Sequence, residues 1–173
     1  MFLAGIQKLT LLDYPGKVAC TVFTAGCDLR CPFCHNASLA LPERERDSME
    51  LGDLLAFLKK RRGILDGVAV TGGEPLMHAG IADVLSEIKA LGYSVKLDTN
   101  GTFPERLRGI VEAGLADRVA MDIKAAPENY GKLVGIGNFN LGPVRESVQY
   151  LMGCGVDCEF RTTAVRGLHT RAD

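Results

Sequence analysis

The sequence predicts a single α/β domain over residues 1–173, built on a parallel sheet with a ligand site at one edge. Short apolar runs rich in valine alternate about five times with stretches of helical spacing. Each apolar run ends in glycine or polar residues, and in parallel folds such ends gather where ligands bind. No segment rich in proline and serine divides the chain, which is long enough to bury one core.

The strand pattern occurs five times along the chain. Each run is short and apolar and is bounded by glycine or polar residues, which is typical of strands buried on both faces. Periodicity does not decide whether the resulting sheet stays open or curls toward a barrel. The expected strands cover residues 17–26, 67–72, 94–100, 118–124 and 157–165.

Four stretches between these strands carry apolar residues at helical spacing. Ser48 is the expected N-cap of the first helix, and Gly63 and Gly92 end the first two helices. Pro104 is tolerated in the first turn of the third helix, and Pro143 comes directly before the apolar stripe of the fourth. The stripes are Leu51, Leu54, Leu55 and Leu58; Ile81, Val84, Leu85, Ile88 and Leu91; Leu107, Ile110 and Val111; and Val144, Val148 and Leu151.

The overall charge gives no reason to expect nucleic acid or a membrane as partner. Twenty lysines and arginines face 21 acids, which leaves a net charge of -1. No run approaches the roughly 18 apolar residues of a spanning helix, and the start lacks the pattern of a signal peptide. We therefore expect a cytoplasmic protein, in which clustered cysteines bind metal or do redox chemistry rather than form disulfides.

Three cysteines lie in "GCDLRCPFCHN", residues 26–36, at the spacing C-x3-C-x2-C. Zinc sites take four protein ligands, or three plus an exchangeable position, and an all-cysteine catalytic zinc site is unusual. A [4Fe–4S] cluster normally takes four thiolates. Cys27, Cys31 and Cys34 would therefore leave one iron open to a ligand from outside the protein. The alternative, buried or redox thiols, fits a polar loop less well. Cys20 is expected to be a core residue. Structural roles are also expected for Cys154 and Cys158, with a second metal site or a redox pair as the alternative.

Polar residues end the remaining strands, so one edge of the sheet should collect them. Asp122 and Lys124 alternate across Ile123 and share one face of their strand. Ordinary turns and solvated ion pairs are the competing interpretation of these groups. The candidates are Gly72, Gly73 and Glu74; Asp98, Thr99 and Asn100; Asp122 and Lys124; and Arg161.

The cysteine spacing, with Phe33 before the last cysteine, resembles the signature of the radical S-adenosylmethionine (SAM) enzymes, and "GGEP" at 72–75 supports it. A longer resemblance covers nearly the whole chain. The run "GIQKLTLLDYPGKVACTVFTAGCDLRCPFCHN", with "DTNG" and "DIK" further on, is similar to the glycyl-radical-enzyme activases, most of all those of anaerobic ribonucleoside-triphosphate reductase. This resemblance implies a parallel-stranded partial (β/α)6 barrel.

The resemblance also implies the cofactors and the roles of individual residues. A [4Fe–4S] cluster on Cys27, Cys31 and Cys34 would bind SAM and cleave it reductively to methionine and a 5′-deoxyadenosyl radical. Asp13 would face the substrate glycine loop, although "DYPG" is also good turn chemistry. The expected SAM contacts are Phe33 for adenine; Gly72, Gly73 and Glu74 for the ammonium; Asp98, Thr99 and Asn100 for ribose or ammonium; Asp122 and Lys124 for ammonium and carboxylate; and Arg161 for the carboxylate.

The implied partners are anaerobic ribonucleotide reductase as protein substrate and a flavodoxin or ferredoxin as electron donor. The family core usually has six strands, and five strand patterns precede Asp173, so we expect the chain to lack the C-terminal strand and helix. Two alternatives remain from the sequence. One is a small-molecule radical SAM enzyme of the carboxydeazaguanine synthase type, and the other is a non-catalytic metal or iron–sulfur binding module.

Overall fold

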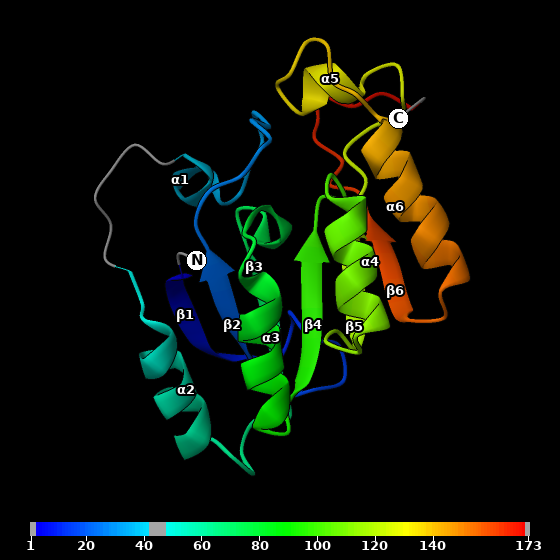
Figure 1. Ribbon diagram of the computed structural model, residues 1–173. Coiled ribbons are helices and arrows are strands. Elements are labelled where there is room, and N and C mark those ends of the chain that lie inside the picture. The colour runs from blue at the N-terminus through cyan, green and yellow to red at the C-terminus, as the bar shows by residue number, and fades with distance from the viewer. Residues whose placement is uncertain (1–2, 42–47, 172–173) are drawn as a thin grey trace.

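A six-stranded sheet in the order β1-β2-β3-β4-β5-β6 is the frame of the protein (Figure 1). The computed structural model describes residues 3–41 and 48–171. β1 pairs with β2 in the antiparallel sense, and all following neighbours are parallel. The strands are β1 (Leu3–Thr10), β2 (Ala19–Thr24), β3 (Gly67–Gly72), β4 (Ser94–Thr99), β5 (Arg118–Asp122) and β6 (Asp157–Arg161).

All five predicted strands are present and parallel, which confirms the predicted fold class. The additional strand, β1, was not predicted. It is an edge strand whose middle is exposed, with buried residues at Leu3 and Thr10. A strand with one neighbour buries no continuous apolar run, so the pattern that revealed the central strands is missing there.

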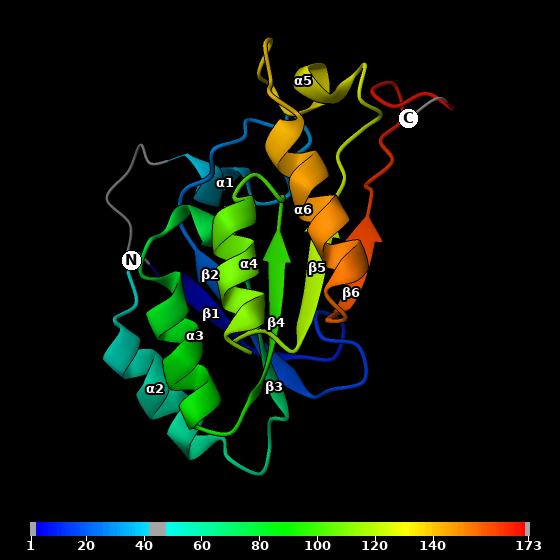
Figure 2. The ribbon, with the colours of Figure 1, turned by 45° about the vertical axis from the view of Figure 1, so that its right-hand side comes forward.

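The longer helices cover one face of the sheet (Figures 1 and 2). They are α2 (Leu51–Lys60), α3 (Ile81–Ala90), α4 (Pro104–Glu112) and α6 (Gly142–Gly153), and the short elements are α1 (Ala37–Ala40), η1 (Pro75–Met77) and α5 (Tyr130–Leu133). The predicted helical stripes face the strands: Leu54, Leu85 and Leu107 are buried in one core with Val70 and Leu97.

The predicted N-cap of α2 is wrong. The helix begins after Glu50, which has extended backbone angles and makes no side-chain cap bond. Ser48 lies two residues too early to accept a hydrogen bond from the first turn. The two proline predictions hold, since Pro104 opens α4 and Pro143 lies in the first turn of α6.

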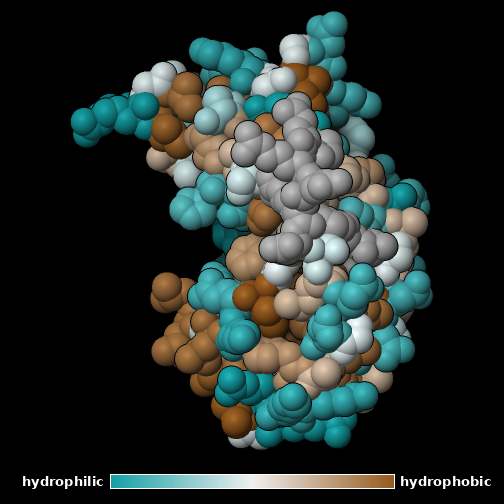
Figure 3. Space-filling view, turned by 90° about the vertical axis from the view of Figure 1, so that its left-hand side faces the viewer, coloured by the Kyte–Doolittle hydropathy of each residue, from teal (hydrophilic) through white to brown (hydrophobic). Residues whose placement is uncertain are grey.

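Among the residues that the structure describes, no helix covers the other face of the sheet, and the molecule is hollowed there (left side of Figure 3). Successive strand residues point to opposite faces, so Val95 and Leu97 face the helices while Lys96 and Asp98 face the hollow. Helices outside and a polar hollow inside are the arrangement of the predicted partial barrel. Within the described ranges, no helix is long and apolar enough to cross a membrane.

The chain after β3 lies against the chain after β2 at a distance that only glycine allows. The Gly73 amide donates to the Thr24 carbonyl at 2.9 Å, and the Glu74 amide donates to the Gly26 carbonyl at 2.8 Å. A Cβ on Gly73 would collide with the Gly26 carbonyl oxygen, and Gly72 combines a φ of +127° with a similar collision at Thr24. This contact brings the "GGEP" turn beside the start of the cysteine loop.

Replacing Gly73 with alanine is expected to lower the free energy of unfolding by at least about 2 kcal/mol, because backbone must move to admit the methyl group. Gly109 is the matched control. It lies in α4 with open space around its Cβ position, so Gly109→Ala should stabilise the protein by about 0.5–1 kcal/mol. Urea unfolding followed by circular dichroism measures both; equal stabilities of wild type and Gly73→Ala would contradict the close contact.

Candidate functional site

A cavity of about 250 Å³ lies at the carboxyl ends of the parallel strands. All five parallel strands, or the turns that follow them, contribute side chains to its wall. Every predicted site residue except Asp13 lines it: Cys27, Cys31, Phe33, Cys34, Gly72, Gly73, Glu74, Asp98, Thr99, Asn100, Asp122, Lys124 and Arg161. The structure therefore brings together residues that are up to 134 positions apart in the sequence, from Cys27 to Arg161.

The cysteine loop that follows β2 is anchored by backbone contacts. The Gly26 amide donates to the Leu39 carbonyl at 2.7 Å, and the Arg30 amide donates to the Val134 carbonyl at 2.8 Å. All three cysteines of the loop are free thiols. Burial raises the pKa of Cys27 to about 12 and also raises the pKa of Cys31. Metal binding must therefore release protons from these sulfurs.

The donor set of this loop suits an iron–sulfur cluster. In the part of the chain that the structure describes, no group of three or more His, Cys, Asp or Glu side chains could hold a single metal ion. Three thiols nevertheless border one cavity, and sulfur donors are those that iron–sulfur clusters use. Cys20, Cys154 and Cys158 do not line the cavity, so none of them supplies a fourth sulfur to its wall.

Glu74 is buried, with 1% of its surface exposed, and it joins the ends of β3 and β4. Its Oε1 accepts hydrogen bonds from the Leu76 amide at 3.0 Å and the Thr99 hydroxyl at 2.8 Å, and its Oε2 accepts from the Asn100 amide at 2.7 Å. Burial raises the pKa of Glu74 to about 7 even though these donors oppose the shift. A carboxylate offers about four acceptor positions, so one position remains for a ligand.

Asn100 connects the end of β4 to the cysteine loop. Its side-chain amide donates to Asp28 Oδ1 at 2.9 Å, and its Oδ1 accepts from the amide and hydroxyl of Thr102 at 2.9 and 2.7 Å. Asn36 ties the far end of the same loop to β3 by donating to the Gly72 carbonyl at 3.2 Å. The loop is therefore bonded to two strand ends as well as to its own neighbours.

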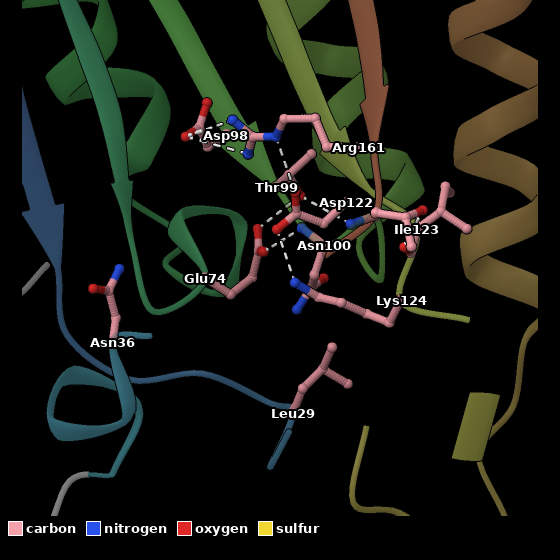
Figure 4. Close-up of polar contacts among 12 residues, drawn as sticks. Leu29, Asn36, Glu74, Asp98, Thr99, Asn100, Asp122, Ile123, Lys124 and Arg161 are labelled. Carbon is pink, nitrogen blue, oxygen red and sulfur yellow. Dashed lines mark hydrogen bonds and ion pairs between the residues drawn. The ribbon is translucent and has the colours of Figure 1, made fainter. Parts of the chain in front are cut away.

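The charged residues of the site converge from neighbouring strands (Figure 4). Asp122 accepts from Lys124 Nζ at 2.8 Å and from Arg161 Nε at 3.0 Å. Arg161 also reaches Asp98 at 3.4 Å. Burial alone favours the neutral amine of Lys124, but the Asp122 carboxylate outweighs it and raises the pKa of Lys124. Both cations at the cavity therefore remain charged beside their carboxylates.

Two residues near the site were not identified from the sequence. Lys96 lies two residues before Asp98, on the same face of β4, and its Nζ contacts Asp98 Oδ1 at 2.6 Å. The spacing "KLD" mirrors the "DIK" spacing at 122–124 and was the available signal. His169 packs edge-on against Phe33 with ring centroids 5.5 Å apart and contacts the Lys124 carbonyl through Nε2 at 2.8 Å. It carried no sequence signal.

Asp13 lies apart from the cavity. It belongs to the connection between β1 and β2, at the opposite end of β2 from the cysteines. Its Oδ2 accepts a hydrogen bond from the Thr21 hydroxyl at 2.5 Å, and its amide donates to the Thr10 hydroxyl at 3.1 Å. The contact with Thr10 is local, as in a turn, whereas the contact with Thr21 joins the Asp13 carboxylate to β2. A role at the substrate remains a prediction for this residue.

Comparison with protein families places most of the chain in one group. The family model described as the radical SAM superfamily matches residues 21–170. A solved structure of SuiB from Streptococcus suis bound to S-adenosylmethionine has a TM-score of 0.59 at 16% identity, over 79% of this chain and 30% of that one. At this identity the structural likeness supports the fold alone.

Curated relatives differ in the activities that their names state. A protein of Methanocaldococcus jannaschii, provisionally named a glycyl-radical enzyme activating enzyme, is 33% identical over 76% of this chain and 53% of its own. The 7-carboxy-7-deazaguanine synthase of Halobacterium salinarum is 38% identical over 53% of this chain and 36% of its own. The GTP 3′,8-cyclase of Aquifex aeolicus is 31% identical over 93% of this chain and 52% of its own length. The chain thus spans about half the length of these relatives, or less.

Glu74 is expected to make stability depend on pH. Folded, its pKa is about 7, whereas its ordinary value is 4.5. Between these values the folded state binds more protons than the unfolded state, so the free energy of unfolding falls as pH rises. Relative to Glu74→Gln, the wild type should lose up to about 3 kcal/mol across this window and nothing further above it. Urea unfolding of both proteins across the window measures this; a difference independent of pH would show that Glu74 is ionised throughout.

Proposed function

The chain belongs to the radical SAM superfamily, and on that premise we propose that it activates a glycyl-radical enzyme by abstracting hydrogen from a backbone glycine of that partner. Radical SAM enzymes use a [4Fe–4S] cluster and S-adenosylmethionine. The observation that carries the proposal is the 33% identity with the M. jannaschii activating enzyme over 76% of this chain. We further propose anaerobic ribonucleoside-triphosphate reductase as the partner and a flavodoxin or ferredoxin as the electron donor.

Cys27, Cys31 and Cys34 would hold the cluster, because they are free thiols that border the same cavity. When bound, the cluster supplies the electron for reductive cleavage of the sulfonium. The protein's part is to leave one coordination position to the cofactor, and the wall of the cavity contains no further cysteine. The anchored loop would keep the three sulfurs in place while the cofactor binds.

The polar wall of the cavity offers a partner for each charged group of S-adenosylmethionine. Lys124 would pair with the methionine carboxylate, since it lies at the cavity and stays protonated beside Asp122. The remaining acceptor position of Glu74 would receive the ammonium. Phe33, held edge-on by His169, would pack on the adenine.

The remaining predicted contacts are proposed on the same grounds. Thr99 and Asn100 are both occupied by protein contacts, so their main contribution would be to hold Glu74 and the cysteine loop. Asp98 and Arg161 border the cavity as a pair and would meet the ribose and the carboxylate. Gly72 and Gly73 would let the backbone approach the cofactor closely.

The open side of the barrel supports a protein substrate. The sheet face opposite the helices is hollowed at the surface (Figure 3), and a loop of a partner protein could enter from that side. Asp13 would contribute by contacting the entering loop near Thr21, from whose hydroxyl its carboxylate accepts a hydrogen bond. This role is proposed from the family resemblance.

A small-molecule radical SAM reaction is the second candidate. It is supported by the 38% identity with a carboxydeazaguanine synthase and by the match to a GTP cyclase over 93% of this chain. A third interpretation, a non-catalytic iron–sulfur or metal module, predicts a bound metal with no response to S-adenosylmethionine. The experiments below separate the three.

Removing one cluster ligand is expected to remove the cluster. Cys31→Ser, reconstituted anaerobically with iron and sulfide, should lose most of the iron and the absorption of a [4Fe–4S] cluster. Cys154→Ser is the matched control, because Cys154 is also a half-buried free thiol but does not line the cavity. Iron and sulfide analysis measures both variants; full cluster content in Cys31→Ser would contradict the assignment of the three ligands.

The activase proposal predicts two products under reducing, anaerobic conditions with S-adenosylmethionine. The reconstituted protein should release 5′-deoxyadenosine, and it should produce a glycyl-radical signal in electron paramagnetic resonance when anaerobic ribonucleotide reductase is added. The control is the same reductase with the radical-bearing glycine replaced by alanine. Turnover of a deazaguanine precursor or of GTP without any glycyl signal would support the second candidate instead. A cluster whose spectrum does not change when S-adenosylmethionine is added would support the third interpretation, a non-catalytic module.

A further inference from the structure

A continuous series of charged side chains crosses the inner face of the sheet, from the rim of the cavity to the amino ends of the strands. Its members come from β4, β5 and β6 and from the residues that follow β5. Positive and negative groups alternate without a break along the series. In order from the cavity, the members are Lys124, Asp122, Arg161, Asp98, Lys96, Glu159, Arg118 and Asp157.

The first four members of the series, from Lys124 to Asp98, line the cavity. Lys124 Nζ lies 2.8 Å from Asp122 Oδ2, and Arg161 Nε lies 3.0 Å from Asp122 Oδ1. Arg161 then reaches Asp98 Oδ2 at 3.4 Å. Arg161 Nη1 also lies 4.0 Å from Glu159 Oε1 on its own strand. The position of Arg161 therefore depends on carboxylates of three strands, and its two shorter contacts are to Asp122 and Asp98.

The other four members begin with Lys96, which holds Asp98 in position. Lys96 Nζ lies 2.6 Å from Asp98 Oδ1 and 3.9 Å from Glu159 Oε1. Glu159 in turn accepts from Arg118 at 3.0 Å. The two oxygens of Asp98 are thus divided between two cations: Oδ1 faces Lys96 and Oδ2 faces Arg161.

Lys96 is the member of the series with the least access to water. One per cent of its side chain is exposed, against 15% for Asp98 and 37% for Arg161. A buried ammonium is costly unless it is paired, and Lys96 is paired with Asp98 and Glu159. It does not line the cavity, so a bound cofactor would touch Asp98 and not Lys96.

We propose that Lys96 is a positioning residue for cofactor binding: it fixes the Asp98 carboxylate and, through Asp98, the guanidinium of Arg161. The inference rests on the proposed contact between Asp98 and S-adenosylmethionine. Without Lys96, Asp98 keeps one partner, Arg161, which Asp122 also attracts. Asp98 is then free to turn away from the geometry that the cofactor requires, and binding weakens although no group at the cavity wall has been removed.

The test compares the full chain with Lys96→Met, Lys96→Arg, Asp98→Asn and the double variant Lys96→Met/Asp98→Asn, all reconstituted with iron and sulfide. Equilibrium dialysis with S-adenosylmethionine measures affinity, and iron analysis measures the cluster. We expect Lys96→Met to bind the cofactor about tenfold more weakly with unchanged iron content. Lys96→Arg should recover part of the affinity, because it keeps a cation beneath Asp98.

A matched control removes a lysine charge outside the site. Lys89 Nζ pairs with Asp117 at 2.7 Å, and neither residue lines the cavity. Lys89→Met should therefore leave cofactor affinity unchanged. A comparable loss of affinity in this control would show a general effect of charge or stability and would overturn the inference.

The double variant separates positioning from a structural role. If Lys96 acts through Asp98, removing Lys96 adds nothing once Asp98 is neutral, so the double variant and Asp98→Asn should bind equally. A further loss in the double variant overturns the inference. This comparison also holds if Lys96→Met alone fails to fold, because the double variant removes the charges of Lys96 and Asp98 together.

The remaining outcomes distinguish this inference from the proposals on which it depends. If Asp98→Asn binds the cofactor as wild type does, both the Asp98 contact and the role of Lys96 are overturned. If Asp98→Asn binds S-adenosylmethionine weakly while Lys96→Met binds it as wild type does, the Asp98 contact is supported and the role of Lys96 is overturned. Since the readout is cofactor binding, neither result depends on which substrate the radical attacks.

Discussion

The backbone contact between Gly73 and Gly26 determines where the site can form. Two backbone hydrogen bonds beside this contact hold the turn after β3 in place: the Gly73 amide donates to the Thr24 carbonyl at 2.9 Å, and the Glu74 amide donates to the Gly26 carbonyl at 2.8 Å. The cysteine loop and Glu74 begin at this contact, one on each side of it. Any side chain at Gly73 would separate the two turns, and the thiols would then no longer share a cavity with the carboxylates of β4 and β5.

Glu74 extends this contact to the next strand. A buried carboxylate that accepts from the backbone of its own turn and from Thr99 and Asn100 makes the ends of β3 and β4 a single unit. Asn100 then returns to the cysteine loop through Asp28. Hydrogen bonds thus connect the ends of β3 and β4 with the cysteine loop. These bonds hold the polar and charged groups of the cavity wall in position for a ligand in a partly dehydrated space.

The charges on the inner face complete the site by compensating one another. Each carboxylate from the cavity rim to Glu159 has at least two cationic partners, so the charged groups can be partly buried without an unpaired member. The helices cover the opposite face mainly with apolar side chains, and the buried Ser147 of α6 donates to the Gly101 carbonyl. The same strands therefore build a dry core on one side and an electrostatically balanced site on the other, because their side chains alternate.

The sequence alone determined the strand and helix alternation, the three cysteines and the polar strand ends, because covalent spacing and local periodicity encode all of these. Tertiary structure decided what each polar residue contacts. It placed Glu74 among three protein donors, left Asp13 in a turn outside the cavity, and set Lys96 beneath Asp98. It also added β1, whose exposed middle gave no buried run. Most of these outcomes depend on how segments that are far apart in the sequence are placed beside one another, and the residue pattern of one strand does not say which polar side chains its neighbours bring to it.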